Sequence, residues 1–414
     1  MAAKPDHLER TAAEPRDKSL HTIILEHIDE VNDTTRVFRL GIPRGSPPIR
    51  FLPGQWLDVY LPGIEKAGGF TITSTPRDAR LAHPSPPEPK DDGREAEDGE
   101  SQDSNKNKNM KREGPYLELA VQKSPDNPPA AWLWQNAVNE SGSESGGIIG
   151  KDIRVRVGGT FVWPPPGINV RTLRRVVFVA GGVGVNPLVS MLCSLASASS
   201  APKTSTTGAG DLEVRFIYSA KDPGVDSSSK GKRGAGNVRN ARNVLFLERI
   251  ARVFRRGLVK GRLELFLTGG ADAGTTDTTK DTTEAGTEEG EGQNAETGLK
   301  SHEDGDADEV EDGEIIVGAG NTGNGDGDGD VKDDNKNEKD EAKENDEEFT
   351  IPFHPRRCTV EDDVATAIGN PRFTVVYVCG VPDMTDEFVA KLTGPQSEGG
   401  LGMEPHRVLC EKWW

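Results

Sequence analysis

The sequence is poor in cysteine, in aromatic residues and in long apolar runs. Its 414 residues contain four cysteines, none at a CxxC or similar spacing, so neither a disulfide framework nor a metal or iron–sulfur site is expected. A reducing intracellular compartment fits this usage. No apolar run approaches the roughly 18 residues that cross a membrane. The first twenty residues lack the apolar core of a signal peptide, and their acidic side chains are atypical of a mitochondrial presequence.

The net charge of −18 is concentrated in one segment. Residues 271–350 contain 28 Asp or Glu and 6 Lys, a net of −22, which leaves +4 for the rest of the chain. This segment has scarcely any large apolar residue, so it buries too little surface to offset the entropy lost on ordering. We predict a disordered acidic insertion over 271–350, and a second disordered insertion over 82–114, which is rich in proline and charge. Neither nucleic acid nor a membrane is expected as a partner of the folded part.

The remaining chain changes its pattern near residue 171. Before it, six short segments with strand-like composition and turn signals predict a closed antiparallel barrel. These segments are 21–29, 35–41, 56–61, 70–74, 117–122 and 153–157, with one short helix at 129–139. After it, apolar strands alternate with helical segments, which predicts a parallel sheet. We therefore predict a tail over 1–20, a barrel domain over 21–170 and an α/β domain over 171–414.

The chain is organised around the junction of a strand, a glycine-rich turn and a helix at 175–192. The apolar run 176–180 is typical of a strand buried on both faces. Three glycines follow and allow close approach of a ligand to the backbone, and a proline suits the first helical turn. Such a helix N-terminus binds phosphate well, although a tight turn without a ligand gives the same pattern. The candidate nucleotide-binding residues are Gly181, Gly182, Val183, Gly184, Val185, Asn186 and Pro187.

Several short motifs carry a family resemblance. They are HLERTA at 7–12, PGQW at 53–56, GGF at 68–70, PPAAW at 128–132, VRVGGTF at 155–161, AGGVGVNPL at 180–188, CGVPDM at 379–384 and EKWW at 411–414. In this order they resemble the oxidoreductase NAD-binding domain-containing proteins, a branch of the ferredoxin–NADP reductase superfamily. The resemblance covers nearly all of the chain except the two insertions. It implies a flavin-binding barrel followed by a nicotinamide-nucleotide domain.

The resemblance also implies where a flavin, FAD or FMN, would bind. The superfamily motif Arg-x-Tyr-Ser/Thr corresponds to Gly68, Gly69, Phe70 and Thr71. Phe70 would lie against the flavin ring, and Thr71 would offer its hydroxyl and N–H near flavin N5. The motif that holds the flavin phosphate corresponds to Gly158, Gly159 and Thr160. Position 68 lacks the usual arginine fork, so the expected substitutes are backbone N–H groups at Gly158 and Gly159 and at the start of the 129–139 helix, with charge from Arg154 or Arg156.

On the nucleotide side, the resemblance places Cys379, Gly380, Pro382 and Met384 near the nicotinamide. Cys379 would position the ring rather than act as a nucleophile; a small buried hydrophobe is the alternative interpretation. Trp414, or its neighbour Trp413, would cover the flavin face. Lys221 follows the second parallel strand, where a cation would favour the 2′-phosphate of NADP, but Asp222 stands beside it. An ordinary surface lysine is equally compatible with the sequence.

These residues predict a flavin-dependent NAD(P)H oxidoreductase. Thr71, Cys379 and Trp414 are its candidate catalytic residues, hydride passes from the nicotinamide to flavin N5, and electrons leave to an unknown acceptor. Because the chain has no cluster cysteines, an iron–sulfur or haem acceptor would be a separate protein. The alternatives are a regulatory NAD(P)-binding protein that has lost flavin chemistry and a scaffold whose acidic insertion binds basic partners. The family resemblance suggests a mitochondrial location, with the cytoplasm as the alternative.

Overall fold

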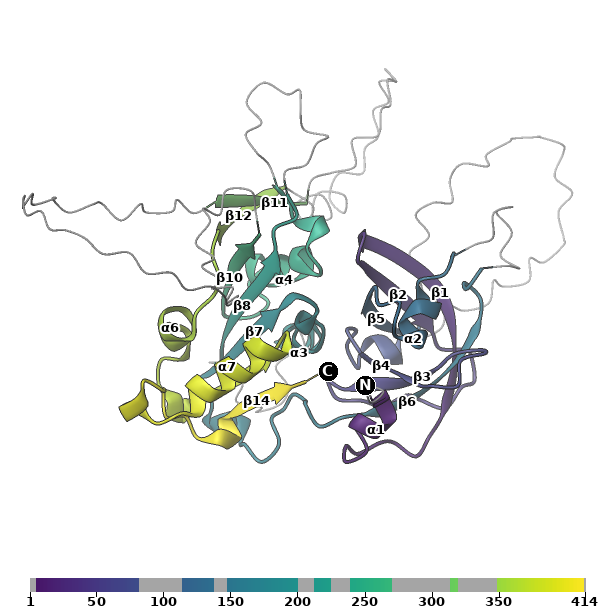
Figure 1. Cartoon of the computed structure of the whole chain (residues 1–414), viewed down its shortest axis with the longest axis horizontal. Helices are drawn as coiled ribbons and strands as arrows, with labels where there is room; N and C mark the ends of the chain where they lie inside the picture. The colour runs from purple at the N-terminus through teal and green to yellow at the C-terminus, as the bar shows by residue number, and fades with distance from the viewer. Residues whose placement is uncertain are drawn as a thin grey trace, which may run out of the picture.

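The computed structural model describes residues 5–81, 114–137, 147–199, 212–224, 239–269, 313–318 and 348–412. Two sheets stand side by side in it, one built from the first part of the chain and one from the second (Figure 1). Most of the two predicted insertions, 82–114 and 271–350, lies outside the described residues, as do Trp413 and Trp414.

The first sheet has six antiparallel strands in the order β4-β3-β6-β1-β2-β5. They are β1 His21–Asn32, β2 Thr35–Gly41, β3 Trp56–Tyr60, β4 Gly68–Thr71, β5 Tyr116–Gln122 and β6 Asp152–Gly158. Its edge strands meet, because Ile72 pairs with Leu119 and the Thr73 N–H donates to the Glu118 carbonyl oxygen at 2.9 Å. The sheet therefore closes into a barrel, which confirms that part of the predicted fold class.

The barrel core follows the two-residue period of its strands. In β6, Ile153, Val155 and Val157 are at most 3% exposed, and they alternate with charged residues on the outer face. Two short helices, α1 His7–Arg10 and α2 Pro128–Leu133, pack against β4 from outside. Helix α1 lies within the predicted tail 1–20, and residues 5–20 of that tail form part of the barrel surface.

The second sheet has eight strands in the order β14-β13-β7-β8-β10-β12-β11-β9, and all pairs except β11 with β12 are parallel. They are β7 Arg175–Gly181, β8 Glu213–Lys221, β9 Arg239–Asn240, β10 Gly261–Thr268, β11 Gly313–Val317, β12 Phe349–His354, β13 Thr374–Cys379 and β14 Val408–Glu411. This confirms the predicted α/β architecture. Strand β11 differs from the prediction, since it lies inside the predicted disordered insertion. Its Ile315 and Val317 are fully buried, which is enough to add this apolar run to the sheet edge.

Helices cover both faces of the second sheet. They are α3 Val185–Ser199, α4 Leu247–Arg255, α6 Ala365–Ile368, which continues a π-helical turn at Val360–Val364, and α7 Pro382–Thr393. Phe178 of β7 packs with α3 and α4, whereas its neighbours Val177 and Val179 pack with α6 and α7. The segment Gly182–Ser199 is long and apolar enough to cross a membrane, but 56% of it is buried here, as befits a core helix.

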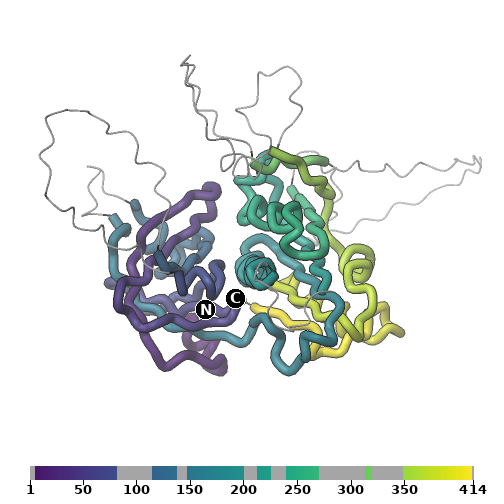
Figure 2. Tube along the Cα trace, turned by 180° about the vertical axis from the view of Figure 1, so that it is seen from behind, coloured from purple at the N-terminus to yellow at the C-terminus, as the bar shows by residue number. Residues whose placement is uncertain are grey.

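Helix α3 lies at the junction of the two sheets (Figure 2). Its Ser190 hydroxyl donates to the Ser74 carbonyl oxygen at 2.7 Å, and Asn186 Nδ2 donates to the Ala120 carbonyl oxygen at 3.0 Å. Short 3-10 turns connect the larger elements: Asp78–Arg80, Val170–Thr172, Gly182–Gly184, Ala241–Asn243, Pro371–Phe373, Gln396–Glu398 and Pro405–Arg407. The junction fixes the barrel against the carboxyl ends of β7 and β13, where open α/β sheets bind ligands.

Candidate functional site

A pocket of about 430 Å³ opens at this junction, a volume within the usual range of small-molecule sites. Its walls come from α1, β4, the ends of β5 and β13, the start of α2 and the turn before α3. The predicted site residues that line it are Gly68, Gly69, Phe70, Thr71, Val183, Gly184, Asn186, Cys379 and Gly380. Thus the two halves of the site that the sequence predicted separately do meet in one place.

Other predicted residues do not line this pocket. They are Gly158, Gly159, Thr160, Gly181, Gly182, Val185, Pro187, Lys221, Pro382 and Met384. Several of these support the lining instead, since Val185 and Pro187 are buried in the first turn of α3. The prediction for Trp414 lies outside the described residues.

The glycine turn is shaped by the end of β13. A Cβ on Gly184 would lie 2.1 Å from the Cys379 carbonyl oxygen, and one on Gly181 would lie 2.6 Å from Met384 Sδ. Gly182 faces open space but has a φ of +55°, which favours glycine. The glycine at 184 is therefore required by close packing against backbone, whereas at 181 the nearest atom belongs to a flexible side chain. The packing at Gly184 brings the turn and Cys379 together at the pocket.

This packing predicts the effect of alanine at position 184. Gly184→Ala must push the turn away from β13, because a backbone oxygen occupies the space of the new methyl group. We expect the free energy of unfolding to fall by about 1–2 kcal/mol, as for other overpacked sites, in urea titrations followed by circular dichroism. The matched control, Gly182→Ala, meets no atom within 4 Å and is expected to lose about 1 kcal/mol at most, from backbone strain. Equal losses would contradict the packing explanation.

Asn186 of α3 lines the pocket with an amide that is bound to the barrel. The side chain is 7% exposed, and its Nδ2 donates to the Ala120 carbonyl oxygen, which can only accept. This bond fixes the orientation of the amide and leaves Oδ1 without a partner among the described residues. A buried acceptor without a donor is costly, but this oxygen is closed to solvent although the pocket is open, so it offers no contact to a ligand in this arrangement.

On the barrel side, Phe70 and Thr71 are buried and end strand β4 at the pocket. The Thr71 hydroxyl has no hydrogen-bond partner in the described part of the chain, so it is free to meet a ligand. Gly68 is enclosed: a Cβ there would lie 2.5 Å from the Phe70 ring and 2.7 Å from the Pro129 side chain. An arginine at position 68 would have to displace both.

Cys379 is fully buried at the end of β13. Burial, together with the nearby Glu411 carboxylate and Cys410, raises the pKa of its thiol well above the ordinary value. The thiol is therefore neutral and a poor nucleophile. This agrees with a positioning role rather than covalent chemistry.

The predicted flavin-phosphate motif is covered by the N-terminal segment. The Gly159 N–H donates to the Pro15 carbonyl oxygen at 3.1 Å, and the Thr160 hydroxyl donates to Glu14 Oε2 at 2.8 Å. The space over Gly158 and Gly159 is filled by the Trp56 indole, which would lie 2.5 Å from a Cβ on either residue. Contrary to the prediction, these residues accommodate the protein's own side chain, and the Gly159 N–H is not available to a phosphate.

Of the two arginines expected to supply charge, Arg154 is exposed and does not line the pocket, and Arg156 is bound elsewhere in the protein. Arg156 Nη2 donates to Asp58 Oδ2 at 2.6 Å and to the Tyr60 hydroxyl at 3.0 Å. Helix α2 begins with Pro128 and Pro129, which have no N–H. These two positions therefore donate no backbone hydrogen bond, and phosphate binding by the rest of the helix start, where Ala130 lines the pocket, stays a prediction.

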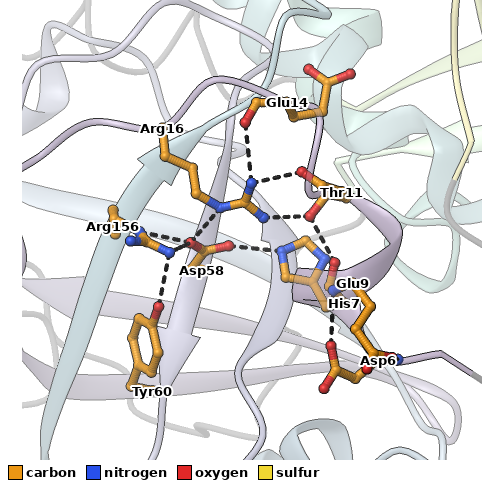
Figure 3. Close-up of polar contacts among 9 residues, drawn as sticks. All are labelled: Asp6, His7, Glu9, Thr11, Glu14, Arg16, Asp58, Tyr60 and Arg156. Carbon is orange, nitrogen blue, oxygen red and sulfur yellow. Dashed lines mark hydrogen bonds and ion pairs between the residues drawn. The ribbon is translucent and has the colours of Figure 1, made fainter.

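Asp58 anchors the N-terminal segment through His7 and Arg16, and it also binds Arg156 of β6 (Figure 3). His7 Nε2 lies 2.9 Å from Asp58 Oδ1, and Arg16 Nε donates to Asp58 Oδ2 at 3.0 Å, beside the contact from Arg156. Burial by itself would raise the pKa of this fully buried carboxyl, but the hydrogen bonds from His7, Arg156 and Arg16 outweigh it and hold the pKa below its usual value. The His7 ring occupies the space beside Gly69, where a Cβ would lie 2.1 Å from His7 Cε1.

Lys221 lies outside the pocket, exposed at the end of β8. Its neighbour Asp222 forms an ion pair with Arg239, with Nη2 and Oδ2 2.7 Å apart. Sequence reasoning missed the pocket residues Arg10 and Lys66 and the anchor His7, because each gains its place only through contacts with distant segments. The HLERTA motif was the one local signal for His7 and Arg10, and Lys66 had none.

The chain is similar in sequence to several curated proteins. No protein-family profile matches the chain. Curated relatives named oxidoreductase NAD-binding domain-containing protein 1 match from Bos taurus, with 29% identity over 53% of this chain and 56% of the relative, and from Danio rerio, with 32% identity over 46% and 53%. These matches confirm the predicted resemblance, and the chain spans about half the length of the curated relatives it matches. The flavohemoprotein of Bordetella pertussis is 30% identical over 30% of this chain and 31% of its own.

Two solved structures align with most of this chain. A flavohemoglobin from Malassezia yamatoensis with bound FAD and heme aligns at a TM-score of 0.48 and 11% identity, over 98% of this chain and 63% of that one. A ferredoxin NADP⁺ reductase from Neisseria gonorrhoeae with bound FAD and NADP aligns at a TM-score of 0.42 and 11% identity, over 96% and 100%. These scores are low, and the fold assignment rests on the strand order of the chain itself.

Proposed function

We propose that this protein is an NAD(P)H-dependent flavin oxidoreductase that uses FAD or FMN and passes electrons to a separate acceptor. The observation that carries the proposal is the junction pocket, where Phe70 and Thr71 of the barrel meet Gly184 and Cys379 of the α/β part. The relatives named for an NAD-binding domain support the nicotinamide half of the proposal. The general oxidoreductase class follows from these relatives; the flavin chemistry is the finer step.

The residues present fit a flat, hydrogen-bonding ring. When bound, flavin supplies acceptance of a hydride from nicotinamide at its N5 atom. Phe70 offers an apolar wall, and the Thr71 hydroxyl offers a hydrogen bond. Cys379 closes the end of β13 with a neutral, water-excluding side chain. The chain thus contributes alignment and exclusion of water.

A second candidate is a regulatory NAD(P)-binding protein without flavin. The engaged Gly159 N–H and the enclosed Gly68 favour it, because both remove expected contacts with a flavin phosphate. It keeps the glycine turn and the Cys379 end of the pocket. The two candidates differ in whether the purified protein holds or takes up flavin.

The visible absorption spectrum of the purified protein tests the proposal. We expect a flavin spectrum, present at isolation or after incubation with FAD or FMN, that bleaches on anaerobic addition of NADH or NADPH. The nucleotide that bleaches it identifies the donor. A protein that stays colourless after both incubations, yet binds NADH by calorimetry, would contradict the oxidoreductase and support the regulatory candidate.

A further inference from the structure

Two cationic side chains line the pocket from segments outside the predicted motifs. Arg10 is the last residue of α1, and Lys66 lies in the turn before β4. Both are exposed, and neither forms an ion pair or a side-chain hydrogen bond within the described ranges. They therefore present charge to the pocket rather than to another part of the protein.

The position of Arg10 is fixed although its helix has a single turn, a length that is unstable by itself. The Asp6 side chain accepts from the Glu9 N–H at 3.0 Å, and the Glu9 carboxylate accepts from the Asp6 N–H at 3.0 Å. His7, one residue further, is bound to the buried Asp58. This double anchoring holds the end of α1, and with it the base of the Arg10 side chain, at the rim of the pocket.

The carboxylates of the pocket do not cancel these cations. Asp6 lines it but serves as the N-cap of α1, and Asp126 lines it from the loop between β5 and α2. Neither lies within ion-pair distance of Arg10 or Lys66 in the structure. Meanwhile Arg156 is bound to Asp58, and the start of α2 has no N–H at its first two residues. Arg10 and Lys66 are thus the side-chain cations lining this pocket in the described part of the chain.

We propose that Arg10, together with Lys66, binds the phosphate group of the nucleotide that occupies this pocket. The proposal rests on the proposed function, since it assumes that a flavin or nicotinamide nucleotide enters here. A guanidinium presents paired N–H groups that match phosphate oxygens, and an ammonium adds a point charge. The N-terminal segment then acts as part of the binding site: it covers the glycines of β6 and supplies a cation in their place.

The test compares ligands with and without phosphate on two variants. Binding of riboflavin, FMN, FAD and NADH is measured by calorimetry or flavin fluorescence for the parent protein, Arg10→Gln and Lys66→Gln. We expect Arg10→Gln to weaken binding of the phosphate-bearing ligand about tenfold, the effect of one charge-assisted hydrogen bond. The affinity for riboflavin, which has no phosphate, is expected to stay unchanged. Arg10→Lys retains the positive charge but not the paired N–H groups of the guanidinium, and we expect it to lose less affinity for the phosphate-bearing ligand than Arg10→Gln does.

Arg44→Gln is the matched control, because Arg44 is exposed in the loop between β2 and β3 and does not line the pocket. A loss for FMN and FAD assigns the phosphate to flavin, and a loss for NADH alone assigns it to the nicotinamide nucleotide; both support the proposal. Unchanged binding of all phosphate ligands, or equal losses for riboflavin and FMN, would overturn it and leave the proposed function intact. A parent protein that binds none of the four ligands would contradict the proposed function itself.

Discussion

Replacement of Arg249 by methionine is expected to lower the free energy of unfolding by about 3 kcal/mol, the low end of the range for breaking a buried ion pair. Arg249 of α4 reaches across the junction and donates to both carboxylate oxygens of Glu118 on β5, at 2.7 and 2.9 Å. The Glu118 side chain is 12% exposed, so its charge would stay largely buried without a partner. The low end applies because Arg249 itself is 39% exposed.

The same pair gives the stability a defined pH dependence. Burial alone would raise the pKa of Glu118, but the charge and hydrogen bonds of Arg249 and the bond from the Thr73 hydroxyl at 2.7 Å outweigh it and hold the pKa below 4.5. A carboxyl group whose pKa is lower in the folded than in the unfolded protein stabilises the folded state at pH values above its unfolded pKa. This contribution disappears as the pH falls through its folded pKa. We expect the parent protein to lose this contribution below about pH 4.5.

Urea titrations at pH 7 and pH 4 measure both effects, with Arg262→Met as the control. Arg262 is 56% exposed and pairs with Glu264 on the surface at 2.7 Å, so its loss is expected to cost less than about 1 kcal/mol. The double variant Glu118→Gln/Arg249→Met removes the unpaired charge but keeps an acceptor for Thr73, and we expect it to recover more than half of the loss. A single variant as stable as the parent would show that the pair does not hold the junction together.

The strands of this fold could be predicted because their signals are local. The period-two alternation of β5 and the unbroken apolar run of β7 place these strands correctly to within one or two residues. Strand β11 was missed, because its five residues stand in a long acidic segment whose composition dominates any window around them. Composition describes the segment on average and does not exclude a short paired strand within it.

The site residues, too, could be predicted only where their signal is local in the sequence. The turn before α3 was predicted with its helix, because strand, glycines and helix are contiguous in the sequence. Gly158 and Gly159 were misinterpreted as a ligand cradle, since a glycine pair is needed equally beside a ligand and beside the indole of Trp56. Sequence cannot say which of the two fills the space, because Trp56 lies a hundred residues away on another strand.

The ion pairs could not be predicted from the sequence, because their two partners are distant in it. His7 and Asp58 are 51 positions apart, and Glu118 and Arg249 are 131 apart. Each member, taken alone, looks like an ordinary charged residue of a helix or strand. Their roles follow only from the topology, which brings α1 onto β3 and α4 onto β5.

Asp58→Asn is expected to release the N-terminal segment from the barrel and to lower the free energy of unfolding by about 4 kcal/mol. The carboxylate is fully buried and is the shared partner of His7, Arg16 and Arg156. An asparagine cannot balance two guanidinium groups and offers only one acceptor oxygen. The remaining contacts of the segment are weaker: backbone bonds such as that from the Asp17 N–H to the Val157 carbonyl oxygen at 2.8 Å, the exposed bond from the Thr160 hydroxyl to Glu14, and ring contacts with Trp56.

Hydrogen exchange of the backbone amides measures this release directly. We expect exchange at residues 10–17 and at Gly159 to rise at least about tenfold in Asp58→Asn, corresponding to about 1.4 kcal/mol or more of local stability. Tyr60→Phe is the matched control, because it removes only the hydroxyl that accepts from Arg156 at 3.0 Å. An exchange pattern in Asp58→Asn that resembles Tyr60→Phe would contradict the anchoring role.

The pKa of Asp58 sets the conditions for this measurement. Because it lies below the ordinary value of 3.8, the folded parent keeps the carboxylate charged at neutral and mildly acidic pH and loses its contribution only as the pH falls below about 4. The protection of the N-terminal amides in the parent, relative to their intrinsic exchange rate at each pH, should therefore fall below that pH, and the variant should show no such step. Because α1 also carries Arg10, we expect Asp58→Asn to lower the affinity for phosphate-bearing ligands about as much as Arg10→Gln does. Tyr60→Phe should leave this affinity unchanged. Retained affinity in a variant whose N-terminal segment has been released would show that the nucleotide is held without it.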